Sequence, residues 1–104
     1  MKKVYVAHPY TTHGDPAANA QMQVSICRDI LSRGYIPVSP ILTFGQAIPH
    51  DEANYELAME ACFWLLSACD EIWFFGEWEK SKGCTLEFKK AEELGIPVKF
   101  GLNN

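Results

Sequence analysis

Short apolar runs alternate with longer stretches of helical periodicity along the chain of 104 residues. The apolar runs that we expect to form strands are Val4–Ala7, Tyr35–Val38, Glu71–Phe75 and Ile96–Phe100. The segments between them with helical periodicity are Pro16–Arg33, Ala53–Ala68 and Lys82–Leu94. Strands that alternate with helices in this way predict an α/β fold, with a parallel sheet and helices on both of its faces.

The ends of the first helix carry clear signals. Asp15 is a good N-cap, and Pro16 suits the first helical position. Gly34 follows the last periodic residue, as glycine commonly does at the C-terminal end of a helix. The inner face that we predict for this helix consists of Ala20, Val24, Cys27 and Leu31. Residues 39–52 show no periodicity, and we expect them to form a long loop.

Prolines fix the expected order of the strands. Pro37 and Pro97 fall in the second and fourth strands, and proline belongs on edge strands because it donates no ladder hydrogen bond. The order 2-1-3-4 places these two strands at the edges. We therefore predict a single domain over residues 1–104, with a doubly wound, flavodoxin- or Rossmann-like parallel sheet of about four strands and three helices.

Glu87 stands out because it lies on the apolar side of its helix. Cys84, Phe88, Ala91 and Leu94 have the spacing of a core-facing stripe, and Glu87 falls within that stripe. A glutamate near the start of a helix also complements the helix dipole, so its position alone does not prove a functional role.

The topology predicts where a ligand binds. In open α/β sheets the site lies beyond the carboxyl ends of the strands, where the strand order reverses. Here that point lies between the first and third strands. It brings together the loop from His8 to Gly14, the segment from Ser39 to Phe44 and the loop from Gly76 to Gly83, with Glu87 behind them.

Composition excludes several classes of protein. The net charge of −4 and the lack of a basic cluster argue against binding to a nucleic-acid polymer. No apolar run approaches the ~18 residues of a membrane span, and we see no signal-peptide core, so we expect a cytoplasmic protein. The four cysteines lack zinc-like spacing, and we expect reduced, structural thiols, no metal and no cofactor.

Several motifs together resemble the nucleoside 2-deoxyribosyltransferase superfamily. They are VYVAHPY near the start, the proline-bearing middle loop, and CDEIWFFGEWEKSKGCTLE followed by AEELGIPV. The sharpest element is S-x-G-x-x-x-E, formed by Ser81, Gly83 and Glu87. The likeness covers nearly the whole chain and is strongest to small members of unknown function. It implies that Glu87 is a nucleophile that attacks the anomeric carbon of a deoxyribosyl group.

Two positions depart from the transferase pattern. Ser81 stands where transferases acting on nucleosides tend to have an aspartate, and the related 2'-deoxynucleoside 5'-monophosphate N-glycosidases have a phosphate-binding serine there. The family usually has an acidic residue at the position of Cys62, with Glu60 the nearest substitute in this chain. The first departure favours a phosphorylated ligand, whereas the second leaves the proton-handling group unassigned.

The resemblance implies an N-glycosidase or deoxyribosyltransferase that acts on a nucleoside or its 5'-monophosphate. The alternative is a non-catalytic protein that binds a nucleotide or a nucleotide-derived signal in the same pocket. Beside catalytic Glu87, the residues expected to contact the ligand are His8, Tyr10, Phe44, Glu60, Trp78, Ser81 and Gly83.

The helix over Ala53–Ala68 also predicts an interaction between copies of the chain. Its core stripe leaves Leu57 and Trp64 on the opposite side. A helix that is apolar around most of its circumference is usually covered by another surface. We therefore expect a homo-oligomer, most simply a homodimer through this helix.

Overall fold

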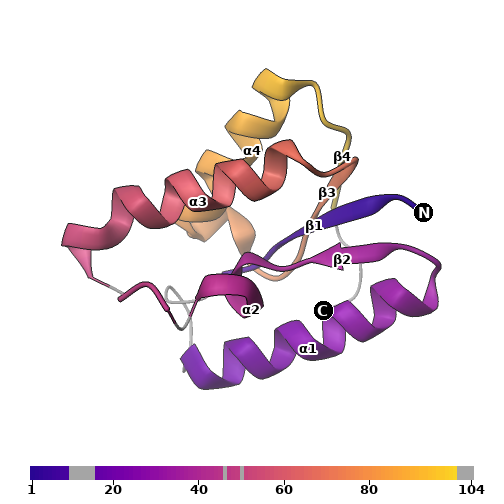
Figure 1. Cartoon of the computed structure of the whole chain (residues 1–104), viewed down its shortest axis with the longest axis horizontal. Coiled ribbons are helices and arrows are strands. Elements are labelled where there is room, and N and C mark those ends of the chain that lie inside the picture. Colours follow the sequence, from indigo (N-terminus) through magenta and orange to yellow (C-terminus); the bar gives the residue numbers. More distant parts are fainter. Residues whose placement is uncertain (10–15, 46, 50, 101–104) are drawn as a thin grey trace.

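A computed structural model describes residues 1–9, 16–45, 47–49 and 51–100. Its strands are β1 (Lys3–Ala7), β2 (Ile36–Val38), β3 (Glu71–Phe74) and β4 (Val98–Lys99). Its α-helices are α1 (Pro16–Ser32), α2 (Pro40–Phe44), α3 (Tyr55–Ser67) and α4 (Lys82–Leu94), with 3₁₀ turns η1 (Glu52–Asn54) and η2 (Trp78–Lys80). The α/β fold expected from the sequence is confirmed (Figure 1).

The four strands form one parallel sheet in the order β2-β1-β3-β4. The predicted strand order is therefore correct. Pro37 lies in the edge strand β2, and Pro97 immediately precedes the other edge strand, β4. The central pair is held in register by Tyr5 beside Ile72 and Ala7 beside Phe74. At the start of that pair, the carboxylate of Asp70 accepts a hydrogen bond of 2.7 Å from the amide of Lys3.

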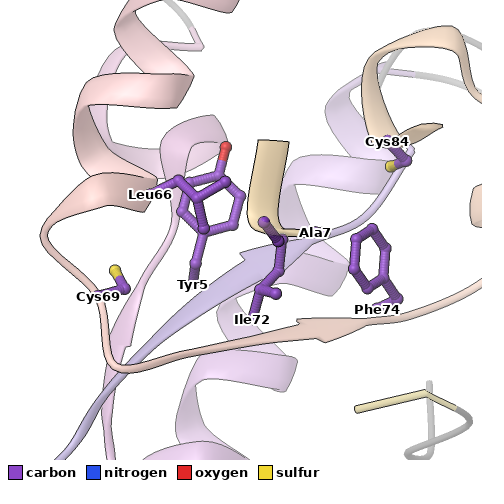
Figure 2. Packing of buried hydrophobic residues seen from close by; sticks show 8 residues of the cluster. Tyr5, Ala7, Leu66, Cys69, Ile72, Phe74 and Cys84 are labelled. Carbon is purple, nitrogen blue, oxygen red and sulfur yellow. The ribbon is translucent and has the colours of Figure 1, made fainter. Parts of the chain in front are cut away.

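Each face of the sheet has its own core, because neighbouring side chains on a strand point in opposite directions. Helices α3 and α4 cover one face, and α1 covers the other (Figure 1). Tyr5 and Phe74 belong to the cluster under α3 and α4, which also contains Leu66 and Cys84 (Figure 2). The alternate residues of the strands pack against side chains of α1. The residues of this second cluster are Val4, Val6, Ile26, Ile30, Trp73 and Phe75.

The predicted inner face of α1 is correct only in part, since Cys27 packs against the core. Gln23, Ile26 and Ile30 are buried, whereas Val24 and Leu31 of the predicted stripe are exposed. The prediction was based on apolar residues alone, whereas the buried Gln23 accepts a hydrogen bond of 2.7 Å at its Oε1 from the Ser39 hydroxyl. Within the described ranges, none of the helices combines the length and apolar character needed to cross a bilayer.

The segment 39–52 was also predicted incorrectly, because part of it is helical. Ser39 caps α2 by accepting a hydrogen bond from the amide of Leu42, and Pro40 occupies the first turn. Asp51 caps η1 in the same manner, through the amide of Asn54. Both caps are visible in the sequence, but each helix is too short to show an apolar period.

Helix α4, which carries Glu87, begins and ends where the sequence indicates. The Ser81 hydroxyl accepts a hydrogen bond of 3.2 Å from the amide of Cys84 at its N-terminal end. Gly95 ends the helix with a φ of 72°, a left-handed conformation that glycine adopts without steric cost. Cys84, Glu87 and Ala91 are buried and Phe88 packs against the same core, as predicted, whereas Leu94 at the end of the predicted stripe is exposed.

Candidate functional site

A cleft of about 890 Å³ opens beyond the carboxyl ends of the central strands. Its floor includes Val6 of β1, and its walls come from the start of α4, one side of α3 and the segment from α2 to η1. Of the predicted site residues, the structure places five in the lining of this cleft, namely His8, Phe44, Ser81, Gly83 and Glu87.

Glu87 is the chemically unusual group of the cleft. It lines the cavity, yet only 6% of its surface is exposed. The Tyr5 hydroxyl, from the central strand β1, donates a hydrogen bond to its Oε2. Burial raises the pKa of Glu87 to about 7, although hydrogen bonds from Tyr5 and Cys62 oppose the shift. Near neutral pH the carboxyl group is therefore poised between its acidic and its anionic forms.

The other groups next to Glu87 are weak acids. Burial, followed by the charge of Glu87, raises the pKa values of the Cys62 and Cys84 thiols to about 12. The same two effects, in the same order, hold the pKa of the buried Tyr5 hydroxyl well above its usual value. These groups keep their protons at neutral pH, so they can donate hydrogen bonds but are poor proton donors in a reaction.

His8 stands at the end of β1, on the floor of the cleft. Its Nδ1 lies 2.7 Å from the carbonyl oxygen of Pro9, which can only accept, so Nδ1 carries the proton. Partial burial lowers the pKa of His8. The ring is therefore neutral at neutral pH, and its Nε2 is left as an acceptor. Gly76 makes room for this ring, because a Cβ atom there would lie 3.3 Å from Nε2.

The N-terminal end of α4 supplies a polar wall. Ser81 is buried, and its hydroxyl accepts a bond from Cys84, so it keeps a proton to donate. Lys82 lines the cleft beside it, and its ammonium lies 4.8 Å from the ring centre of Tyr55. The first N–H groups of a helix have no partner within the helix and favour anions.

The opposite wall is built from α2, η1 and the start of α3. Phe44 and Gly45 contribute an apolar surface, whereas Asp51, Glu52 and Glu56 contribute carboxylates. Gly45 cannot be replaced without a shift, because a Cβ atom there would lie 2.4 Å from the carbonyl oxygen of Ile41. The part of this wall up to Phe44 was predicted, whereas Asp51, Glu52 and Glu56 were not.

Three predicted site residues are not placed in the cleft. Glu60 lies exposed on α3 and does not line the cavity, so it does not replace the acid absent at position 62. Trp78 packs against Phe74, Phe88 and Phe100, with ring centres 4.7–5.6 Å apart, and is also absent from the lining. Tyr10 lies outside the described residues.

Two tyrosines of the site were not predicted. Tyr5 was expected to lie in the first strand and Tyr55 in the helix over Ala53–Ala68, neither of them in contact with the ligand. The Tyr55 hydroxyl is buried and, among the residues that the structure describes, has no hydrogen-bond partner. A buried hydroxyl without a partner costs about 1–3 kcal/mol, so a ligand that bonds to Tyr55 would recover this energy. One sign of a role for Tyr5 was available, because it lies on the side of the sheet that faces Glu87.

The family of the chain follows from a match over almost its full length. A family model described as a domain of unknown function, DUF7768, matches residues 2–101. The chain belongs to this family. No curated protein matches the sequence of this DUF7768 chain.

Solved structures resemble the DUF7768 chain in fold. A 2-deoxyribosyltransferase from Bacillus psychrosaccharolyticus has a TM-score of 0.66 and 16% identity, over 94% of this chain and 70% of that one. A 2-deoxyribosyltransferase from Leishmania mexicana has a TM-score of 0.68 and 20% identity, over 99% of this chain and 65% of that one. The DUF7768 chain therefore spans about two-thirds of the length of these enzymes and shares their α/β fold.

Proposed function

We propose that the protein cleaves or transfers the N-glycosidic bond of a nucleoside or its 5'-monophosphate, with Glu87 as nucleophile. One observation carries the proposal. Glu87 is a nearly buried carboxyl group that faces a cleft at the switch point of the sheet and receives a hydrogen bond from Tyr5. A group that served only to complement the helix dipole would not need burial or a tyrosine donor from another element.

The chemistry requires the anionic form of Glu87. Its carboxylate attacks the anomeric carbon as the base departs through an oxocarbenium-like transition state, and a glycosyl ester forms. Water then releases the sugar, or a second base accepts it. The hydrogen bond from Tyr5 orients the carboxyl group, and the surrounding apolar core keeps it weakly solvated.

The remaining lining residues suit the other parts of such a substrate. The Ser81 hydroxyl and the N-terminal end of α4 would hold a 5'-phosphate, with the charge of Lys82 nearby. Gly83 leaves this end open, since even a Cβ atom there would meet only Met59 and Ser81 at 3.6 and 3.9 Å. Phe44 and Tyr55 offer flat surfaces to the base, and His8 offers an acceptor from the floor.

The test uses a panel of nucleosides, deoxynucleosides and their 5'-monophosphates, with and without a second free base as acceptor. We expect release or exchange of a base by the wild type, and a loss of at least about 1,000-fold in the Glu87→Gln variant, which retains the shape of the side chain. Glu60→Gln is the matched control, because it makes the same change on the exposed side of α3. Equal turnover by the wild type and Glu87→Gln would overturn the role of Glu87.

A second function is favoured by the weak acids around Glu87. Cys62, Tyr5 and His8 are all unsuited to give a proton to a departing base at neutral pH. A protein that only binds a nucleotide or a nucleotide-derived signal needs no such donor. Tight binding of a panel member by calorimetry, with no base released from any of them, would establish this alternative and overturn the enzymatic proposal.

A further inference from the structure

The charges around the cleft are strongly unequal. Carboxylates line it at Asp51, Glu52, Glu56 and Glu87, against a single ammonium at Lys82 among the described lining residues. Glu52 and Glu56 are exposed at the mouth, whereas Asp51 is occupied as the cap of η1, with Asn54 donating to its Oδ1 from both the backbone and the side chain. The potential at the η1–α3 side of the cleft is therefore negative and attracts cations.

The groups that face Glu87 cannot supply a proton readily. They are Tyr5, Tyr55, Cys62 and Cys84, and burial and the charge of Glu87 raise the pKa of each one. His8, also in the cleft, is neutral and directs its N–H at the carbonyl of Pro9. The ammonium of Lys82 lies over the ring of Tyr55, 4.8 Å from the ring centre, and the carboxyl groups of Glu52 and Glu56 are exposed at the mouth.

The missing acid restricts the leaving group. When a neutral base departs, it takes the electron pair of the C1'–N bond and becomes an anion unless it is protonated. When the base already carries a fixed positive charge, the same electron pair neutralises it, and no proton is needed. General acids contribute about 100-fold to 10,000-fold to such reactions, so a site without one favours the second kind of substrate.

We propose that the cleft acts on N-glycosides whose base bears a fixed positive charge, such as an N-alkylated purine or a pyridinium. The inference rests on the proposed function and names its substrate class. The base lies against the acidic η1–α3 side, with Glu52 and Glu56 near its charge, and the sugar lies toward Glu87.

The reaction is balanced without further groups. A bond forms between a Glu87 oxygen and C1', the C1'–N bond breaks, and its electron pair ends on the ring nitrogen, which leaves as part of a neutral base. Water then attacks C1', the carboxylate of Glu87 departs, and one proton passes to the solvent. No oxidant, reductant or acid catalyst is consumed.

The first test compares 2'-deoxyguanosine with N7-methyl-2'-deoxyguanosine, which differ by one methyl group and one charge. Base release is followed by chromatography, and each rate is divided by the rate without enzyme, since the cation hydrolyses faster by itself. We expect this enhancement to be at least about 100-fold larger for the methylated substrate. Equal enhancements would overturn the inference while leaving the proposed function intact. If neither these probes nor nicotinamide 2'-deoxyriboside is cleaved, as nucleosides or as 5'-monophosphates, the proposed function itself fails.

The second test restores an acid beside Glu87. Cys62→Asp should raise the rate with 2'-deoxyguanosine at least about 10-fold and leave the rate with the methylated substrate unimproved. Cys62→Asn is the matched control, because asparagine has the shape of aspartate but no acidic proton. It should not raise the rate with either substrate. If Cys62→Asp raised the rate equally with both substrates, or if Cys62→Asn raised it as much as Cys62→Asp, the lack of an acid could not be the cause of the substrate preference.

A third test avoids any change in the core, in case Cys62→Asp fails to fold. With nicotinamide 2'-deoxyriboside as substrate, the rate should rise as Glu87 ionises around pH 7 and stay level up to about pH 9. A fall between those values would reveal a required acid and overturn the inference.

The double variant with Glu52→Gln and Glu56→Gln should raise KM about 3-fold to 10-fold for the cation only. Glu60→Gln, outside the cleft, should leave KM unchanged.

Discussion

At the scale of single residues, the site is organised by one carboxyl group that the core tolerates poorly as an anion. Glu87 reaches the cleft from the first turns of α4, but it is buried beside Tyr5, Cys62 and Cys84. Its hydrogen bonds come from a tyrosine and a thiol instead of from cations. The protein therefore maintains its proposed nucleophile at the expense of stability.

The Glu87→Gln variant measures how much the buried carboxylate lowers the free energy of unfolding. The folded-state pKa of about 7 exceeds the ordinary value of 4.5, so the folded protein binds the extra proton between these values. Stability must then fall as the pH rises from about 4.5 to 7, by about 3 kcal/mol if the whole shift is expressed. We expect Glu87→Gln to lack this loss and to be more stable than the wild type at pH 8. Urea unfolding at pH 4.5 and pH 8 tests this, and an equal pH dependence in both proteins would contradict it.

Individual residues show where the sequence is informative about the site. Glu87 was predicted because it is a polar residue within an apolar stripe. Ser81 and Gly83 were predicted because they stand at the start of a helix. Tyr5 and Tyr55 were missed, because a tyrosine in an apolar run has the same pattern whether its hydroxyl is used or not. Trp78 was placed at the ligand, whereas it packs with Phe74, Phe88 and Phe100. The contacts of an aromatic ring depend on tertiary packing, which no local pattern describes.

At the scale of elements, the strand order could be predicted from the two prolines, and the inner face of α1 could not be. Proline has no backbone N–H to donate to a neighbouring strand, so this residue type by itself indicates an edge strand. The face of α1 depends instead on Ser39, whose hydroxyl donates a hydrogen bond to Oε1 of Gln23 from a distant part of the chain. Long-range hydrogen bonds of this kind make a polar residue suitable for a core, and the sequence gives no direct sign of them.

The short strand β4 depends on a charged anchor at its junction with β3. Glu71 is buried at the start of β3 and accepts a hydrogen bond of 2.8 Å from Nε1 of Trp73. Lys99 of β4 lies 3.3 Å from the same carboxylate, and Lys2 lies 3.5 Å from its other oxygen. The hydrogen bond from Trp73, followed by Lys99 and Lys2, lowers the pKa of Glu71 in spite of its burial.

Glu71→Gln should weaken this anchor. Because the folded-state pKa of Glu71 is depressed, its contribution is present above the ordinary value of 4.5 and is lost as the pH falls through the folded value. We expect the variant to be about 1–2 kcal/mol less stable at pH 7, with the difference closing in acid. Thermal or urea unfolding at both pH values provides the measurement. A difference that persists in acid would assign the loss to packing and not to charge.

At the scale of the whole molecule, the exposed side of α3 is the best candidate for contact with a second copy of the chain. Trp64 is 74% exposed and Leu57 is 55% exposed, two turns apart on the same side of the helix. Both belong to one ridge, and a two-fold axis would bring that ridge against its own copy, which is the commonest symmetry of homo-oligomers. Glu60, between them, would lie at the border of such a contact and remain solvated.

Sedimentation at micromolar concentration tests this proposal. We expect the mass of a dimer for the wild type and the mass of one chain for Trp64→Glu. Leu31→Glu is the matched control, since Leu31 is 52% exposed on α1, which covers the other face of the sheet. The wild type sedimenting as a single chain, or both variants dissociating alike, would exclude a dimer through α3.

The two walls of the cleft are built in different ways, and this has a consequence for how the family can diverge. Tyr5 lies on a strand paired on both sides, with Val38 and with Ile72, so the backbone behind Glu87 should exchange its amide hydrogens only on global unfolding. The wall from α2 to η1 consists of short capped turns with few such constraints. Apart from Gly45, relatives could therefore accumulate changes between residues 44 and 56, and acquire new ligand preferences, while the carboxyl group of Glu87 stays in place.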